Sequence, residues 1–288
     1  MDLNDDGFND ILSGSYSWNN QELGMAGTFQ VLYGEDDGGF KKSIDLTGSD
    51  DEVLIIPASE DNIIEKICTR PTATDWDGDG DLDLIVGNFA GTFYIFDGAG
   101  GDGFYPEPHQ VMVGDEPLLV PGMHSDPFVV DWDGDGDMDL LSGSAQGGVF
   151  LAENTAGAGV TPELKAFEVL IEPAGYAQAG ANATPTAPAG STRVWVDDIN
   201  GDGKLDLLVG DSARVVTYPE GVTPEESQAR QAEWDQKTQE IIAELQAHED
   251  PQSEAYQEVI QRYQTHYQSR SEFILEESTG FVWLYLRQ

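Results

Sequence analysis

Short apolar runs recur at four places in the chain, and each is followed by glycine at once or after one residue. These runs occupy residues 11–12, 84–86, 140–141 and 207–209. A short apolar run bounded by turn residues is typical of a buried β-strand. Further strand signals precede the runs at residues 72–74, 128–130 and 193–196 and follow them at 27–33, 91–96 and 148–151. The pattern therefore predicts a repeating antiparallel unit.

Each apolar run closes a thirteen-residue motif that is rich in aspartate. The four copies align without gaps at residues 2–14, 75–87, 131–143 and 198–210, at spacings of 73, 56 and 67 residues. An acid or amide stands at positions 1, 3, 5 and 9 of every copy, and glycine stands at position 6. Internal repetition of this kind indicates a repeat architecture.

The spacing of the acidic positions suits a calcium loop. Alternate residues of a tightly curled loop point inward, so positions 1, 3 and 5 converge, the carbonyl of position 7 joins them and position 9 closes the shell. Hard oxygen ligands at this density suit Ca²⁺, which takes about 6–8 oxygens. Zinc would need His or Cys, which the motif lacks. An EF-hand would need Glu at position 12 and flanking helices, whereas strands are predicted here.

Three or four antiparallel strands in a repeat of roughly 60 residues are typical of a propeller blade. The motif D-x-[DN]-x-D-G-x-x-D-[ILM]-[IL]-x-G resembles the FG-GAP or VCBS repeat family, known from integrin α-chain heads and bacterial secreted proteins. The resemblance covers residues 2 to about 211. It implies an all-β fold: a β-propeller of about four antiparallel blades, with more blades in a fuller chain. It also resembles exported bacterial members that carry a helical insertion near the C-terminus.

Carried over residue by residue, the resemblance implies about four structural Ca²⁺ ions. The ligand sets are Asp2, Asn4, Asp6 and Asp10 with the Phe8 carbonyl; Asp75, Asp77, Asp79 and Asp83 with the Asp81 carbonyl; Asp131, Asp133, Asp135 and Asp139 with the Asp137 carbonyl; and Asp198, Asn200, Asp202 and Asp206 with the Lys204 carbonyl. All protein ligands of a site come from one loop, which favours a structural role over a catalytic one.

Candidate ligand contacts stand where the predicted inner strands begin. Arg70, His124 and Arg193 occupy matching places before their loops. Such positions line the mouth of the channel in propellers, although caps and ion pairs with the many acids are the simpler interpretation. Trp18 lies in a polar segment and is the best exposed candidate for stacking on a sugar. The other tryptophans considered are expected to pack in the core: Trp76, Trp132, Trp195 and Trp283.

Charge excludes several classes of partner. The chain has 54 acidic and 13 basic residues, a formal net charge of −41, and no Lys or Arg from residue 71 to residue 160. Such a surface repels phosphate backbones and anionic lipid, so neither nucleic-acid binding nor membrane insertion is expected. The single cysteine, Cys68, cannot form an internal disulfide. Bound cations would relieve part of the self-repulsion.

The character of the sequence changes near residue 222. Thr223, Pro224 and Glu226 form a capping box with proline at the first helical position, and a second helix start follows at Asp250-Pro251. Residues 280–286 return to a strand pattern. We therefore expect propeller blades at residues 1–221, a helical hairpin inserted at 222–276, and the closing strand of the last blade at 277–288.

These observations predict a binding module and not an enzyme. No nucleophile motif, metalloprotease motif or phosphate-binding glycine loop is found in the sequence. The expected role is an extracellular, periplasmic or cell-surface adhesion or scaffold module for protein or glycan ligands, whose signal peptide is not in this chain. A carbohydrate-active enzyme, either a polysaccharide lyase or a hydrolase, remains the alternative, because an acid pair could hide among so many acids.

Overall fold

A computed structural model describes residues 1–16, 27–57, 60–101, 103–174, 177–179, 185–248 and 250–288. The described chain is mostly β, with antiparallel sheets and two α-helices. It divides into two units. The first contains Met1–Gly175, Ala187–Ser212 and Phe281–Gln288, and the second contains Tyr176–Thr186 and Ala213–Gly280.

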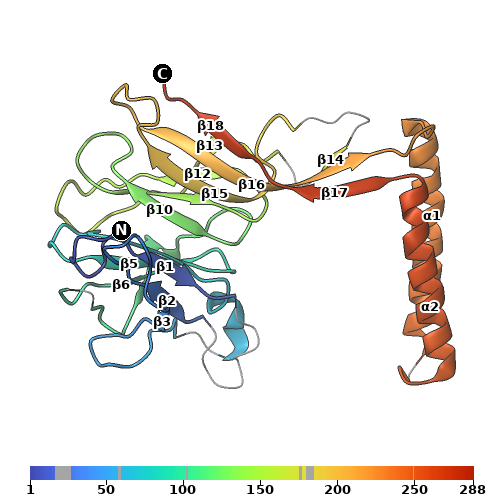
Figure 1. The fold of residues 1–288 in the computed structure, drawn as a ribbon, viewed down its shortest axis with the longest axis horizontal. Coiled ribbons are helices and arrows are strands. Elements are labelled where there is room, and N and C mark those ends of the chain that lie inside the picture. Colours follow the sequence, from blue (N-terminus) through green and yellow to red (C-terminus); the bar gives the residue numbers. More distant parts are fainter. Residues whose placement is uncertain (17–26, 58–59, 102, 175–176, 180–184, 249) are drawn as a thin grey trace. The chain divides into compact units, whose positions relative to one another are not determined.

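Four larger antiparallel sheets form most of the first unit (Figure 1), and each contains one copy of the aspartate motif. Sheet one is β1 (Ile11–Gly14), β2 (Phe29–Leu32) and β3 (Ile44–Asp45). Sheet two is β4 (Arg70–Thr74), β5 (Asp83–Gly87), β6 (Phe93–Phe96) and β7 (His109–Gln110). Sheet three is β10 (Asp126–Val130), β11 (Asp139–Gly143), β12 (Val149–Ala152) and β13 (Glu168–Ile171). Sheet four is β15 (Gly190–Asp197), the first part of β16 (Asp206–Thr217) and β18 (Val282–Tyr285).

The motif occupies the same place in three of the sheets. It connects the first strand to the second, so the residue before position 1 pairs with the aspartate at position 9: Thr74 with Asp83, Val130 with Asp139, and Asp197 with Asp206. Sheet one has the second, third and fourth strands of this plan, and no described strand precedes its loop. In the sequence, the 3-10 helix η2 (Glu60–Glu65) precedes sheet two. The short hairpin of β8 (Met112–Val113) and β9 (Glu116–Pro117) follows sheet two.

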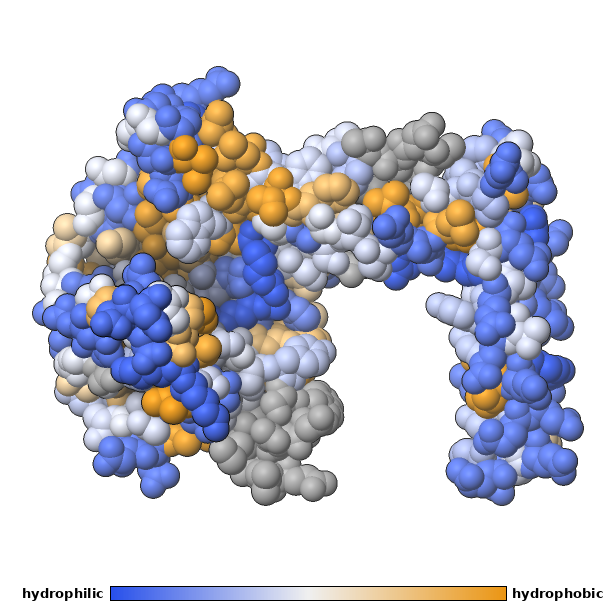
Figure 2. Space-filling view, in the orientation of Figure 1, coloured by the Kyte–Doolittle hydropathy of each residue, from blue (hydrophilic) through white to orange (hydrophobic). Residues whose placement is uncertain are grey.

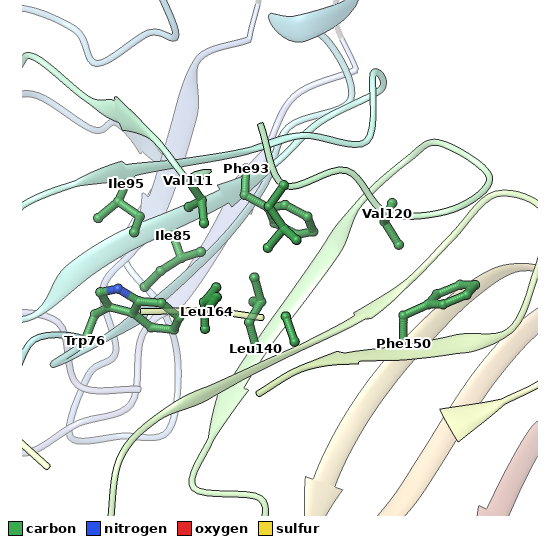
Figure 3. Close-up of a cluster of buried hydrophobic side chains, with 11 residues drawn as sticks. Trp76, Ile85, Phe93, Ile95, Val111, Val120, Leu140, Phe150 and Leu164 are labelled. Carbon is green, nitrogen blue, oxygen red and sulfur yellow. The ribbon is translucent and has the colours of Figure 1, made fainter. Parts of the chain in front are cut away.

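Alternating side chains bury both faces of the middle sheets. In β5, Leu84 and Val86 pack toward sheet one, whereas Ile85 packs toward sheet three (Figure 3). In β11, Leu140 packs toward sheet two and Leu141 packs toward sheet four. Successive strand residues point to opposite faces, so one apolar run serves two cores. The described strands form separate stacked sheets and do not close into a barrel.

The second unit has a β-ribbon and a helical hairpin. The second part of β16, residues Ala213–Thr217, pairs with β17 (Leu275–Thr279) and with β14 (Ala177–Ala179). The helices are α1 (Pro224–Gln246) and α2 (Glu254–Gln268), followed by the 3-10 helix η3 (Ser269–Glu272). Thr223 caps α1 by accepting from the Glu226 amide, and Ser253 caps α2.

The expected boundaries of the insertion differ from those in the structure. The second unit starts at Ala213, not at residue 222, because β16 continues beyond sheet four and pairs with β17. β17 consequently belongs to the second unit, and the strand that returns to sheet four is β18, starting at Val282. Among the described residues, no helix combines the length and apolarity needed to span a bilayer.

Candidate metal centres and the arginine cluster

The aspartate at position 9 holds each loop in place. Asp83 is buried, and its carboxylate accepts hydrogen bonds from the Trp76 amide at 2.9 Å and the Gly98 amide at 2.8 Å. Asp139 and Asp10 make the same pair of bonds with the amides at the matching positions. Position 9 therefore ties the start of the loop to the end of the third strand, which secures two backbone donors that burial would otherwise leave unpaired.

The fourth loop departs from this arrangement. Asp206 accepts from the Arg287 amide at 2.9 Å through one oxygen, but its other oxygen, Oδ2, is buried without a partner among the described residues. The expected donor, the Ile199 amide, bonds instead to the Asp197 carbonyl. A buried carboxylate oxygen that accepts no hydrogen bond has its lone pairs available to bind a cation.

The acids at positions 1, 3 and 5 of the second and third loops accept hydrogen bonds from backbone amides of the same loop. In the second loop Asp75 accepts from the Gly78 amide at 2.8 Å, Asp77 from the Asp79 amide at 3.1 Å, and Asp79 from the Asp81 amide at 2.9 Å. The third loop repeats the three bonds with Asp131, Asp133 and Asp135. These local bonds curl the chain so that the carboxylates gather on its inner side.

Two groups of carboxylates lie close enough together to share one ion. Oxygen atoms of Asp75, Asp77 and Asp83 lie within 4.8 Å of one another, and those of Asp131, Asp133 and Asp139 do the same. Both groups consist of positions 1, 3 and 9. The donors are hard carboxylate oxygens with no nitrogen or sulfur ligand, so the residues fit a divalent cation of the Ca²⁺ or Mg²⁺ type.

The other predicted ligands are not part of these groups. Position 5, Asp79 and Asp135, lies outside both triads. In the first and fourth loops, where Asn4 and Asn200 replace one carboxylate, the described acids form no such triad. Asp137 at position 7 is buried, with one carboxylate oxygen bonded to the Gly157 amide and the other unpartnered in the described structure.

The pKa values of the triad acids reflect the crowding. Burial raises the pKa of Asp83 and of Asp139, and nearby acids, among them Asp77 and Asp133 respectively, raise them further. Backbone donors act in the opposite direction but do not cancel the shift. A bound cation would favour the ionised form, because an opposite charge within a few ångströms stabilises a carboxylate.

A second cluster joins the first strands of sheets two, three and four. Arg70, Asp126 and Arg193 are equivalent residues, because each pairs with the glycine that ends its own motif. The Nε atoms of both arginines approach the same Asp126 Oδ1, at 3.6 Å for Arg70 and 3.3 Å for Arg193. Two guanidinium groups therefore share one carboxylate. We call these three residues the arginine cluster.

The three side chains of the arginine cluster differ in how exposed they are to solvent. The Asp126 side chain is 16% exposed and that of Arg70 is 19% exposed, whereas that of Arg193 is 44% exposed. Arg70 also donates to the His124 and Ser125 carbonyls. Burial lowers the pKa of Arg70, and repulsion by Arg193 lowers it further. Arg193 is thus the member that solvent or a ligand can reach.

His124 borders the arginine cluster, so the three predicted ligand contacts do come together. Its ring centre lies 4.2 Å from that of Phe89, and its backbone has a positive φ of 52°. Burial lowers the pKa of His124, as do Arg70 and Arg193, so the neutral imidazole is favoured. Asp126 was not predicted from the sequence, although its alignment with Arg70 and Arg193 relative to the motif glycines could have revealed it.

The tryptophans are not all in the core. Trp76 is buried, and Trp132 and Trp283 pack partly buried in or beside the cores. The expectation for Trp195 is wrong: it is 57% exposed, because it lies on the face of sheet four that no described sheet covers. Its ring makes an edge contact with Phe128. Trp18 lies outside the described residues.

Comparison with known families finds matches in the middle of the chain. A family model described as FG-GAP-like repeat matches residues 75–142 and again 131–209. Together the two matches contain the second and third copies of the motif, with both carboxylate triads, and the fourth copy up to Val209. No curated protein matches the chain significantly.

Proposed function

We propose that this chain, which belongs to the FG-GAP-like repeat family through residues 75–209, is a calcium-stabilised β-propeller module that binds a partner outside the cytoplasm. The observation that carries the proposal is the pair of matching carboxylate triads, Asp75–Asp77–Asp83 and Asp131–Asp133–Asp139, each in the same place of its repeat. In this proposal the four sheets are blades, and the first strands of sheets two, three and four lie nearest the axis.

Calcium is the ion that best suits these loops. A triad supplies three carboxylates, and the carbonyl at position 7 and the side chain at position 5 are near in sequence to complete a larger shell, which Ca²⁺ accepts and Mg²⁺ does not favour. The ion supplies positive charge that holds the loop closed. Asp83 and Asp139 would transmit that order to the sheet, because they also bond the amides that follow the third strands.

We assign up to four such sites, one for each copy of the motif. The unpartnered Asp206 Oδ2 supports a site in the fourth loop. In the first loop, Asp10 keeps the two backbone bonds that Asp83 and Asp139 make. Loops of this kind, whose affinities can be weak, suit the high calcium concentrations found outside cells, in line with a secreted, periplasmic or surface location.

The arginine cluster is the proposed contact for the partner. Two guanidinium groups share one carboxylate, so the cluster keeps one net positive charge within a chain whose formal charge is −41. A carboxylate of a protein or glycan ligand would balance that charge through Arg193, which is the exposed member. The role is binding and not catalysis, and the calcium ions would be structural.

The experiment is a binding screen with the calcium-loaded protein. Glycan and peptide arrays are probed with the unaltered chain and with Arg193→Gln, which removes the exposed charge while keeping a polar side chain. Calcium-dependent binding that Arg193→Gln weakens supports the proposal. Cleavage of a uronic-acid polymer by the unaltered chain would instead make the protein an enzyme and contradict the proposed role.

A further inference from the structure

Sheet four carries an apolar face that no described sheet covers. The face consists of two cross-strand rows on β15, β16 and β18: Trp195, Leu208 and Leu284 are directly paired, and beside them lie Arg193, Gly210 and Val282. Trp195, Leu284 and Val282 are exposed, and Figure 2 shows hydrophobic surface over β18. We call these six residues the open face of sheet four.

The same motif positions are packing surfaces in the middle sheets. Leu208 stands at position 11, and its equivalents Ile85 and Leu141 lie in the cores formed with the following sheet. Gly210 stands at position 13. A Cβ at the equivalent Gly87 would lie 2.4 Å from the Ser125 carbonyl oxygen, and one at Gly143 would lie 2.2 Å from that of Thr192. The open face therefore has the residues of a surface that receives another sheet.

Sheet one carries the matching face. Its outward row pairs Ile11 with Leu32, and the next row contains Ser13, Gln30 and Asp45. Ile11 stands at position 10, and its equivalents Leu84, Leu140 and Leu207 all pack toward the preceding sheet. Ile11 itself is 44% exposed. We call these five residues the open face of sheet one.

We infer that the open face of sheet four packs against the open face of sheet one of a second copy of this chain. The two faces offer the same positions that meet at every sheet junction within one copy, position 11 against position 10. An apolar row faces an apolar row, as it does in the cores between neighbouring sheets within one copy. The contact is head-to-tail, because the two patches differ.

The test is sedimentation velocity over a range of micromolar concentrations in saturating Ca²⁺. The unaltered chain should associate. Leu284→Asp on sheet four and Ile11→Asp on sheet one should each raise the dissociation constant by about tenfold or more, because each buries an unpaired charge at the contact. Leu119→Asp, at an equally exposed apolar residue of another segment, should leave association unchanged. Val282→Asp serves as a second variant of sheet four if Leu284→Asp unfolds.

Mixing the two altered proteins distinguishes the geometry. In a head-to-tail contact, Leu284→Asp keeps an intact sheet one and Ile11→Asp keeps an intact sheet four, so the mixture should recover association that neither protein shows alone. A monomer at every concentration, association that neither variant weakens, or a mixture that fails to associate would overturn the inference. The calcium dependence of the melting temperature is unaffected by any of these outcomes.

Discussion

Sheets two and three each lie between two other sheets, whereas sheets one and four each have one face that no described sheet covers. At position 10, Leu84 and Leu140 are fully buried, whereas Ile11 of sheet one is 44% exposed. At position 11, Ile85 and Leu141 are fully buried, whereas Leu208 of sheet four is only partly buried. The local sequence and the strand are alike in all four. Neighbouring sheets, and not the motif, decide how much each apolar residue contributes to stability.

The largest expected difference concerns position 10. Leu140→Ala removes side-chain atoms from a packed core between sheets two and three and should lower the free energy of unfolding by about 2–5 kcal/mol. Ile11→Ala removes atoms that are already largely exposed and should cost less than about 1 kcal/mol. Denaturant unfolding in saturating Ca²⁺ measures both. Similar losses for the two variants would contradict the difference in packing.

Position 9 gives the next comparison, measured in excess chelator. Asp139→Ala leaves the Trp132 and Asn154 amides without their acceptor and should cost about 2–4 kcal/mol, since each unpaired buried donor costs about 1–3 kcal/mol. Asp206→Ala removes an acceptor for the Arg287 amide alone and should cost about half as much. Asp133→Ala is the control, because Asp133 is exposed. An Asp206 variant as unstable as the Asp139 variant would count against these bonding roles.

The motif glycines provide a steric comparison. Gly143→Ala places a Cβ against the Thr192 carbonyl oxygen and should destabilise the chain by about 1–3 kcal/mol, because backbone must shift. At Gly210 the nearest atom to an added Cβ is the Arg193 Cβ, at 3.8 Å, so Gly210→Ala should be near neutral in the monomer. Thermal unfolding at low protein concentration compares them. Equal destabilisation would show that Gly210 is also enclosed.

The smallest effect concerns pH at the arginine cluster. The pKa of His124 is lowered in the folded state, so the unfolded chain binds a proton first as pH falls below about 6.5. Stability from His124 is therefore present above that pH and is lost as pH falls through the folded pKa. His124→Gln should remove this part of the acid dependence. If the stability of His124→Gln varies with pH in the same way as that of the unaltered chain, this role of His124 is contradicted.

Much of the architecture follows from the sequence, because it depends on local patterns. The strand–loop–strand unit and the family follow from the motif and its spacing, and the family match confirms the family. The two helices follow from a separate local signal, the capping pattern after residue 222. The cap of α1 follows for the same reason, because Thr223 bonds the Glu226 amide only three residues away. The start of α2 differs from the expected Asp250-Pro251: the helix begins at Glu254, and Ser253 caps it.

Features that depend on contacts between distant residues could not be predicted from the sequence. Trp195 alternates correctly for a strand, but its exposure depends on whether a further sheet covers it. Asp126 gains its role only when β4, β10 and β15 come together. The extension of β16 to Thr217 depends on pairing with β17, which lies about sixty residues later in the chain. The separation of Asp79 from the triad is likewise a matter of three-dimensional loop geometry.

The melting temperature of the chain in excess chelator tests the calcium proposal most directly. Calcium bound only by the folded state stabilises it by mass action, by about 2.7 kcal/mol at one hundred times the dissociation constant. Chelation should therefore lower the melting temperature by at least about 5 °C, and Ca²⁺ should restore it where equal Mg²⁺ restores little. The double variant Asp77→Ala/Asp133→Ala should lose most of this response. A melting curve that chelator leaves unchanged would contradict the account.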